Sequence, residues 1–273
     1  MQDKQKKIRV GLVQIPVKLG DRAANQETVR RWMKEFYRPS DVTTALALPE
    51  LWDVGYALDS IPRLADRGGE QAVEFLGSLA KQYNCWFTNG SIAAGDNGLY
   101  YNRSLIVNSS GDLVTKYDKA HLVPFITVED GVFEPGNSVC TYDLDGVAAG
   151  SIVCYDIRFP EWVRIYALRG VEVLFICSQW TRSRMDLFRT MIRAHAIENM
   201  FYTVAVNNCD YSGEIDFGGE SFVANPSGEV TAECSGTFDG QFTEIDVSNI
   251  NENRQFLKVL EKRRPELYGE LTK

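Results

Sequence analysis

One cysteine stands where the sequence changes from an apolar run to a polar turn. Residues 150–153, Gly-Ser-Ile-Val, are typical of the end of a buried strand, and Pro160 suits the first turn of a helix. Cys154 lies between them, near a helix start whose unpaired N–H groups can stabilise a thiolate, the form that attacks carbon. The backbone N–H of Tyr155 is placed to face a developing oxyanion. We therefore expect Cys154 to be a nucleophile.

The competing interpretation is that Cys154 is a small core residue. The other cysteines lie in or beside apolar runs and lack a following Tyr-Asp-x-Arg, so we interpret them as structural: Cys85, Cys140, Cys177, Cys209 and Cys234. Only Cys154 precedes a dense polar cluster, made of Asp156, Arg158 and Glu161. An exposed ion-pair network that adds little to stability is the alternative interpretation of this cluster.

A cysteine nucleophile needs a base. The chain has two histidines, and His195 lies in a helical pattern where a hydrogen-bonded structural role is favoured, whereas His121 lies in an irregular loop and leaves a Cys–His hydrolase open. Glu50 follows a buried strand and a proline, and partial burial raises the pKa of such an acid toward that of a base at neutral pH. Lys119 is a candidate oxyanion donor. Taken alone, each of the last two is equally a solvated charge at the end of an element.

Helical and strand patterns alternate along the chain. Apolar spacing predicts helices over 21–37, 71–83, 161–168 and 184–199. It predicts strands over 8–15, 43–48, 86–93, 99–108, 113–117, 139–144, 147–154, 173–178 and 201–207, then a closing meander over 220–224, 229–234 and 241–246. The irregular stretch 118–137 is long enough to be functional. Because such helices must bury their apolar faces on a sheet, we predict one α/β domain over 1–273, with two packed mixed sheets and outer helices.

Composition excludes several function classes. A net charge of −8 and a pI near 5.0 argue against binding to nucleic acid or to an anionic membrane surface. The chain has no long apolar run and no C-x-x-C pair, and its two histidines lie far apart, so we expect no membrane span and no metal site. The N-terminus alternates like a strand and lacks the apolar core of a signal peptide, which predicts a cytoplasmic protein with reduced thiols.

Three motifs, in this order along the chain, resemble one known family. They are LPELW around Glu50, KYDKAHL around Lys119 and GSIVCYDIRFPEW around Cys154. They are similar to the Glu, Lys and Cys motifs of the nitrilase superfamily of carbon–nitrogen hydrolases, and the similarity extends from about Val10 to Asp246. The resemblance implies a four-layer αββα sandwich and a homodimer. We expect the C-terminal ~25 residues to form a tail or a dimer contact.

Further residues resemble one branch, the amidases that act on ω-amides of 2-oxo acids such as 2-oxoglutaramate. Glu129 falls where these enzymes carry a second glutamate, and Trp180 and Arg184 match their Trp-Pro-x-x-Arg segment. Four positions near the expected pocket wall depart from the pattern and put the substrate in question more than the reaction: Thr181, Leu187, Phe188 and His195.

The resemblance implies amide hydrolysis through a thioester, without a cofactor. Glu50 would take the proton of Cys154, and the thiolate would attack the amide carbon. Lys119 and the Tyr155 N–H would hold the oxyanion, ammonia would leave, and a water activated by Glu50 would release the acid. Glu129 would orient Lys119 or the substrate nitrogen.

A 2-oxo acid amide also carries a carboxylate, which needs a cation in the pocket. Arg184 is the first choice and Arg158 the second, although for Arg158 we favour pairing with Asp156 or Glu161 that braces the loop. Tyr56 and Trp180 are candidate pocket walls or plain core residues. The alternatives to a small-molecule amidase are an N-carbamoyl amidohydrolase or nitrilase on the same fold, and a catalytically silent binding scaffold.

Overall fold

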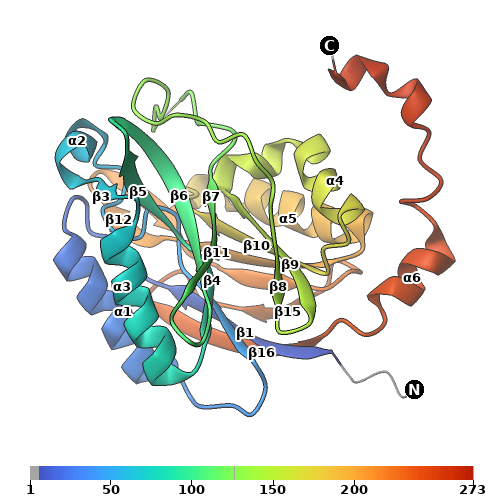
Figure 1. The fold of residues 1–273 in the computed structure, drawn as a ribbon, viewed down its shortest axis with the longest axis horizontal. Coiled ribbons are helices and arrows are strands. Elements are labelled where there is room, and N and C mark those ends of the chain that lie inside the picture. The colour runs from blue at the N-terminus through green and yellow to red at the C-terminus, as the bar shows by residue number, and fades with distance from the viewer. Residues whose placement is uncertain (1–5, 126, 273) are drawn as a thin grey trace.

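Two packed sheets form the centre of the molecule, which we describe from a computed structural model of residues 6–125 and 127–272 (Figure 1). The predicted domain also includes residues 1–5, 126 and 273, which lie outside the described residues. The strands of the first sheet are β1 (Lys7–Gln14), β2 (Thr44–Ala47), β3 (Asp66–Arg67), β4 (Trp86–Asn89), β5 (Ser91–Asp96), β6 (Leu99–Val107), β7 (Leu113–Asp118) and β16 (Asp239–Asp246). They lie in the order β16-β1-β2-β4-β6-β5-β3, and β7 pairs with β6.

The second sheet has the order β15-β14-β11-β10-β9-β8. Its strands are β8 (Cys140–Leu144), β9 (Val147–Val153), β10 (Val173–Ser178), β11 (Tyr202–Asn207), β14 (Phe222–Ala224) and β15 (Val230–Glu233). A separate hairpin consists of β12 (Cys209–Ser212) and β13 (Ile215–Gly218). Sequence patterns did not predict this hairpin.

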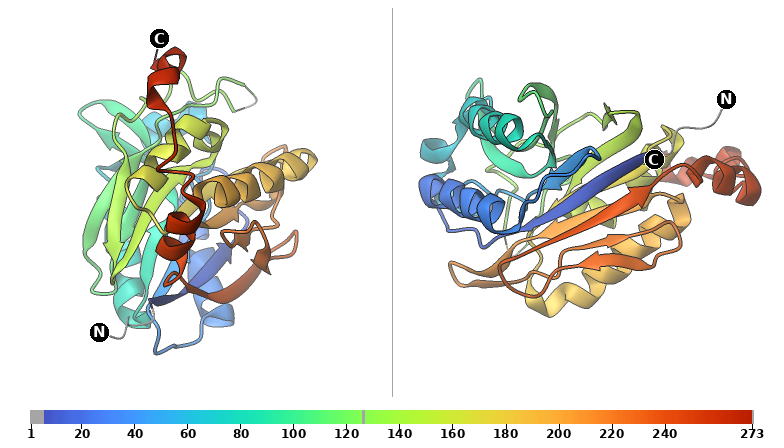
Figure 2. Two further views of the ribbon diagram at one scale, coloured as in Figure 1. Left: turned by 90° about the vertical axis from the view of Figure 1, so that its right-hand side faces the viewer. Right: turned by 90° about the horizontal axis from the view of Figure 1, so that it is seen from below.

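Helices cover the outer faces of both sheets, so the predicted four-layer sandwich is confirmed (Figure 2). The first sheet carries α1 (Arg22–Phe36) and α3 (Glu70–Tyr83), and the second carries α4 (Pro160–Leu168) and α5 (Met185–Asn199). Two shorter helices are α2 (Ile61–Leu64) and α6 (Ile250–Leu257). Each long helix buries the apolar stripe that its sequence predicts, for example Val29, Trp32 and Met33 of α1. Over the described ranges, no helix has the length and apolar character needed to cross a bilayer.

The parallel strands bring the candidate residues together. β1 and β2 run parallel, as do β9, β10 and β11. Glu50 lies three residues beyond β2, Cys154 directly follows β9, and Lys119 directly follows β7. The ends of strands from both sheets therefore deliver these three side chains to one edge of the sandwich.

Two strand predictions were wrong. The segment predicted as one strand over 86–93 is divided into β4 and β5 at Gly90, whose φ of +130° a side chain rarely adopts and whose added Cβ would lie 2.6 Å from Leu48 Cβ. The last predicted strand, β16, does not continue the closing meander of the second sheet. It pairs antiparallel with β1 from Lys7–Asp246 to Gln14–Asp239, and so covers an edge whose backbone groups would otherwise lack partners.

A buried acid links α1 to the loop after β2 and yields a stability prediction. Asp53 Oδ2 accepts a hydrogen bond from Arg22 Nη2 at 3.0 Å, and its Oδ1 accepts one from the Ala93 N–H at 3.2 Å. Burial raises the pKa of Asp53 from 3.8 to about 6, although Arg22 acts in the opposite direction. Between these two values the unfolded chain holds fewer protons at this position than the folded protein, so the stability contributed by Asp53 falls as the pH rises.

We expect Asp53→Asn, which does not titrate, to lack this pH dependence. The difference in free energy of unfolding, wild type minus variant, should fall by about 2 kcal/mol between about pH 4.5 and 7.5. Urea unfolding at several pH values measures it. A difference that stays constant across this range would show that Asp53 is not held with a raised pKa.

Candidate active site

Cys154 occupies a strained turn between strand and helix. It is the first residue of the 3-10 helix η2 (Cys154–Arg158) and has a φ of +46°, in the left-handed region. Non-glycine residues rarely adopt this conformation, and such strain concentrates at functional sites. The buried carboxylate of Asp156 holds the turn, because its Oδ2 accepts hydrogen bonds from the Val153 N–H at 2.9 Å and from the Tyr117 hydroxyl at 2.7 Å.

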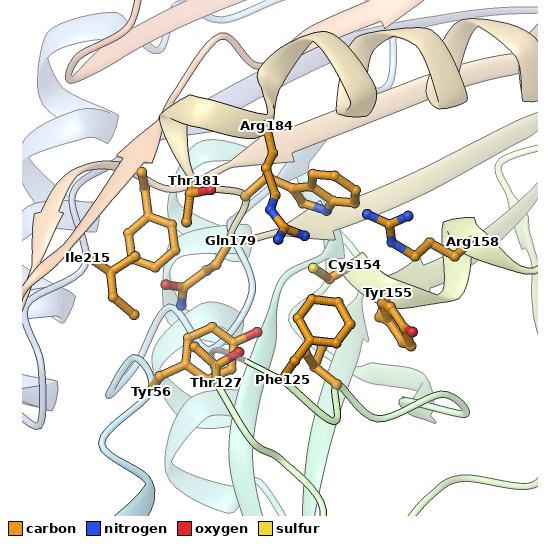
Figure 3. Close-up of a pocket in the computed structure, with 13 residues that line it drawn as sticks. Tyr56, Phe125, Thr127, Cys154, Tyr155, Arg158, Gln179, Thr181, Arg184 and Ile215 are labelled. Atoms are coloured by element: carbon orange, nitrogen blue, oxygen red, sulfur yellow. The ribbon is translucent and has the colours of Figure 1, made fainter.

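Cys154 lies in the wall of a pocket with about 480 Å³ of empty space, its open mouth included (Figure 3). The structure places the predicted substrate-binding residues Tyr56, Arg158, Trp180 and Arg184 in the same pocket. The rest of the lining is largely apolar and comprises Val123, Phe125, Thr127, Tyr155, Gln179, Thr181, Ile215 and Phe217. Ile215 and Phe217 come from the hairpin that sequence patterns did not predict.

Two arginine side chains face this pocket without acidic partners. Among the described residues, the guanidinium groups of Arg158 and Arg184 make no ion pair and no hydrogen bond. Arg158 lies over the Trp180 ring at 5.0 Å from its centroid, and Arg184 lies over the Phe125 ring at 5.4 Å. In Figure 3 both guanidinium groups extend toward the space beside Cys154. The arrangement can bind an anion.

The favoured role of Arg158 as a loop brace is therefore wrong. Asp156 is fully buried and bonds instead to Tyr117 and to His121, so it is not available to Arg158. For the same reason the cluster after Cys154 is not an exposed ion-pair network. The sequence of the polar cluster after Cys154 does not indicate that Asp156 points into the core while Arg158 points into the pocket.

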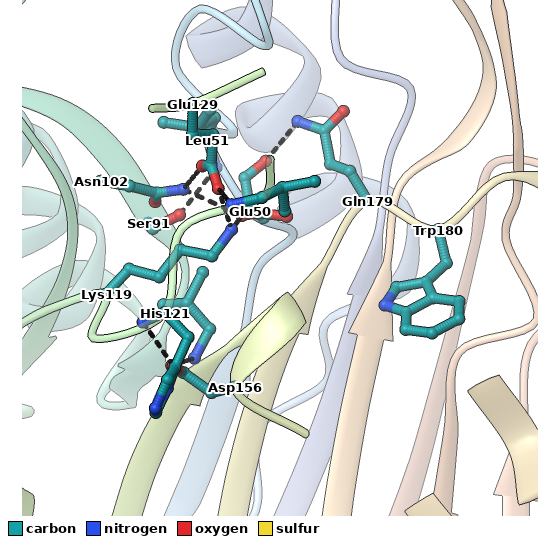
Figure 4. Close-up of polar contacts among 12 residues, drawn as sticks. Glu50, Leu51, Ser91, Asn102, Lys119, His121, Glu129, Asp156, Gln179 and Trp180 are labelled. Atoms are coloured by element: carbon teal, nitrogen blue, oxygen red, sulfur yellow. Dashed lines mark hydrogen bonds and ion pairs between the residues drawn. The ribbon is translucent and has the colours of Figure 1, made fainter. Parts of the chain in front are cut away.

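Figure 4 shows a fully buried network of charges, and two of its members, Glu50 and Lys119, act electrostatically on Cys154. Lys119 Nζ lies 2.7 Å from Glu50 Oε1 and 2.6 Å from Glu129 Oε2. The side-chain amide of Asn102 donates to both carboxylates, at 2.9 Å to Glu50 Oε1 and 2.8 Å to Glu129 Oε1. The Val123 N–H donates to Glu129 Oε2 at 2.8 Å. The structure thus brings the predicted residues Glu50, Lys119 and Glu129 together.

One carboxylate oxygen of this network can still accept a proton or a hydrogen bond. Glu50 Oε2 is buried and has no hydrogen-bond partner in the described part of the chain. Burial and the Glu50 carboxylate raise the pKa of the Cys154 thiol well above its usual range, and Lys119 opposes them only in part. The thiol is therefore protonated at neutral pH and cannot attack until a base removes its proton. A helix start can favour a thiolate, but at this site burial and a neighbouring carboxylate outweigh the effect of one short 3-10 turn.

The carboxylates of Glu129 and Glu50 keep the Lys119 side chain positively charged. Burial by itself lowers the pKa of Lys119, but Glu129 and Glu50 raise it by more. The pKa of Lys119 is therefore well above its usual value. Burial raises the pKa of Glu129, while Lys119 counteracts this effect. A lysine that stays cationic in a fully buried site can stabilise negative charge that develops nearby.

The two histidines have other partners. His121 Nδ1 lies 2.7 Å from Asp156 Oδ1, and the His121 ring stacks on Phe159 at 3.8 Å between centroids. The geometry therefore does not support a Cys–His pair. His195 is buried within α5, and its ring nitrogens lie 2.7 Å from the Ile157 carbonyl and 2.8 Å from Glu198 Oε1. The predicted structural role of His195 agrees with these contacts.

Only one of the four departures from the branch pattern lines the pocket, namely Thr181. Leu187 is 52% exposed on α5, and Phe188 is buried behind the pocket wall, with its ring 5.5 Å from that of Trp180. His195 contacts the turn that follows Cys154. Thr181, Phe188 and His195 therefore lie at or near the pocket wall, as expected, whereas Leu187 faces solvent.

Asn102 and Gln179 were not predicted from the sequence. Asn102 lies inside the apolar strand β6, where a single amide gives no sign of its partners. Gln179 follows β10, and its Nε2 donates to the main-chain carbonyl of Glu50 at 2.6 Å. A polar residue directly after a parallel strand was the one available signal, and it applied to Gln179. In the described ranges, no group of His, Cys, Asp and Glu side chains is arranged to hold a metal ion.

A four-layer sandwich with this site is the arrangement that the resemblance to carbon–nitrogen hydrolases implied. A family model described as carbon-nitrogen hydrolase matches residues 9–255. The chain belongs to this family, whose members hydrolyse carbon–nitrogen bonds.

Similar proteins agree with this assignment. The chain is 33% identical over 260 residues to a 2-oxoglutaramate amidase of Bacillus subtilis, covering 95% of this chain and 98% of the relative. It is 30% identical over 269 residues to a protein of Staphylococcus aureus named hydrolase in agr operon, covering 96% and 100%. The crystal structure of a carbon–nitrogen hydrolase from Helicobacter pylori G27 superposes with a TM-score of 0.87 at 26% identity, covering 98% and 99%.

Proposed function

We propose that this protein hydrolyses the ω-amide of a short 2-oxo acid, of the 2-oxoglutaramate type, to the acid and ammonia. The observation that carries the substrate class is the pair of arginines without acidic partners beside Cys154. A neutral amide would not form charge-assisted hydrogen bonds with two arginines in a largely apolar pocket, whereas a substrate carboxylate would. The similarity to the 2-oxoglutaramate amidase of Bacillus subtilis supports the same class.

In the proposed mechanism, Glu50 Oε2 takes the proton of the Cys154 thiol as the sulfur attacks the amide carbon. Lys119 Nζ and the Tyr155 N–H stabilise the oxyanion, and Glu129 keeps Lys119 oriented and charged. Collapse of the intermediate releases ammonia, which receives the proton from Glu50, and leaves a thioester on Cys154. Glu50 then accepts a proton from water, whose oxygen attacks the thioester carbon, and the thiol is restored as the acid departs.

An assay of product release from matched substrates tests this proposal. We expect ammonia from 2-oxoglutaramate and from 2-oxosuccinamate, with lower kcat/KM for an uncharged amide of the same length. Release of carbon dioxide from an N-carbamoyl amino acid, or turnover of a nitrile, would favour the alternative reactions of this fold. The absence of any turnover, together with an unreactive Cys154, would favour a binding scaffold.

Arg184→Met and Arg158→Met should separate recognition of the carboxylate from the chemistry. Each variant loses a charge-assisted contact, which is expected to lower kcat/KM for 2-oxoglutaramate by about 10- to 100-fold. The uncharged amide of the same length should change by less than about 3-fold, since it makes no such contact. Equal losses on both substrates would show that the arginines do not bind the carboxylate.

We propose a homodimer in the cytoplasm. The segment after α6 extends along and away from the sandwich in Figures 1 and 2. Large apolar side chains at the end of α6 and beyond it, namely Phe256, Leu257, Leu267 and Leu271, are 57–85% exposed. A second copy of the chain would cover this surface. Deletion of residues 256–273, which removes all four of these side chains, should shift the sedimentation coefficient from dimer to monomer, and an unchanged dimer would place the contact elsewhere.

A further inference from the structure

Gln179 contacts both halves of the proposed catalytic site. It directly follows β10 and is 7% exposed, in a position that lines the pocket. Its Nε2 donates to the main-chain carbonyl of Glu50 at 2.6 Å, a bond drawn in Figure 4. Its strand β10 pairs with β9 up to Cys177 and Val153, so Gln179 and Cys154 lie just beyond neighbouring strand ends and line the same pocket. One residue thus bonds to the main chain of the proposed base and lies beside the strand end that carries the proposed nucleophile.

The carboxamide of Gln179 is fixed from its other end. Its Oε1 accepts a hydrogen bond from Asn208 Nδ2 at 2.9 Å. Asn208 is itself held, because its Oδ1 accepts from the Val17 N–H at 3.1 Å and its N–H donates to the Ser178 carbonyl at 3.1 Å. With both polar atoms engaged and the side chain buried, Gln179 has little freedom to change rotamer.

The contacts of Gln179 matter for catalysis because Glu50 and Cys154 belong to different sheets. Glu50 follows β2 of the first sheet, whereas Cys154 follows β9 of the second sheet. Their relative placement therefore depends on contacts across the boundary between two sheets. The sulfur must lie within hydrogen-bond reach of Glu50 for proton transfer, and a displacement of about 1 Å can cost about 100-fold in rate.

We propose that Gln179 is a positioning residue that holds Glu50 and Cys154 at the distance required for proton transfer. This inference rests on the proposed function only for its turnover measurements. The reactivity of the thiol toward an alkylating reagent tests it independently of any substrate.

The test compares Gln179→Met with a matched control, Gln14→Met. Gln14 is also fully buried and also joins separate main-chain segments, since its Nε2 donates to the Ser235 carbonyl at 2.7 Å and its Oε1 accepts from the Ser221 N–H at 2.8 Å. Both variants lose a bridging carboxamide of similar burial. Only Gln179→Met loses the contact to Glu50.

We expect Gln179→Met to lower kcat by about 10- to 100-fold, with KM changed by less than about 3-fold. Alkylation of Cys154 by iodoacetamide, followed on its peptide by mass spectrometry, should be slowed about 10-fold at neutral pH and should approach the wild-type rate at high pH. This convergence is expected because a thiol that ionises in bulk base no longer needs Glu50. Gln14→Met should keep both the kcat and the alkylation profile of the wild type.

Gln179→Glu provides a second test with the shape preserved. Its carboxyl group donates to the Glu50 carbonyl only when protonated, so its thiol reactivity relative to the wild type should recover as the pH falls. A wild-type alkylation profile in Gln179→Met, or the same loss in Gln14→Met, would overturn the proposal. If the wild type is alkylated as expected but releases no ammonia from 2-oxoglutaramate, the proposed substrate fails and the positioning role stands.

Discussion

Replacement of Cys154 with alanine is expected to abolish ammonia release, with kcat at least about 10⁴-fold below that of the wild type. The variant lacks the only sulfur that lines the pocket among the described residues, so no thioester can form. The fold should remain, because removal of one buried sulfur from the pocket wall leaves the hydrogen bonds of Asp156 to the turn in place. Coupled measurement of ammonia and a far-UV circular dichroism melt test both statements.

Cys177→Ala is the matched control. Cys177 is fully buried in β10, the strand next to β9, and burial raises the pKa of its thiol well above the usual range. This variant should lose stability and keep its kcat. If Cys154→Ala retains activity, or if Cys177→Ala is the inactive variant, the assignment of the nucleophile is wrong.

Replacement of Lys119 with methionine should affect both catalysis and stability. Without the ammonium group, the buried carboxylates of Glu50 and Glu129 lose their shared counter-charge. Breaking a buried ion pair in this way costs about 3–5 kcal/mol of unfolding free energy at neutral pH. We expect kcat to fall by at least about 10³-fold, because the oxyanion loses a donor and the Glu50 side chain loses a hydrogen-bond partner that positions it.

The pH dependence of this variant has a defined sign. Loss of Lys119 removes the group that counteracts burial, so the pKa of Glu129 rises further above its unfolded value and the contribution of Glu129 to stability falls as the pH rises. Lys119→Met should therefore be closest to wild-type stability at acidic pH. Lys116→Met, an exposed change on β7 just before Lys119, should alter neither property. A Lys119→Met protein with wild-type stability at every pH would contradict the charge network.

The sandwich could be predicted because apolar runs identify buried strands. The same runs made Glu50 and Cys154 candidates, since each comes shortly after one, but the choice of Glu50 and Lys119 over solvated charges rested on the resemblance of the three motifs to carbon–nitrogen hydrolases. The path of β16 could not be predicted, since the pattern of a strand does not tell which sheet edge it covers. The hairpin of β12 and β13 was missed because its sequence lacks a long apolar alternation, yet it supplies part of the pocket wall.

Residues whose roles depend on distant contacts were not predictable. Asn102 and Gln179 are ordinary amides until the fold places the Glu50 carboxylate and carbonyl beside them. Arg158 was assigned to its sequence neighbours Asp156 and Glu161, but Asp156 turns inward to Tyr117 and His121. The local sequence therefore fixes which groups are near the site, whereas the pairing among them follows from the packing of the two sheets.

The chemical step can be observed directly as an acyl group on one sulfur. The wild-type protein mixed with 2-oxoglutaramate, quenched in acid within its first turnovers and digested, should show the mass of the acyl group on the peptide that contains Cys154. The same peptide from Cys154→Ala should carry no added mass. Turnover without any adduct on Cys154, or an adduct on another residue, would contradict a mechanism in which Glu50, Lys119 and Cys154 act together on one amide.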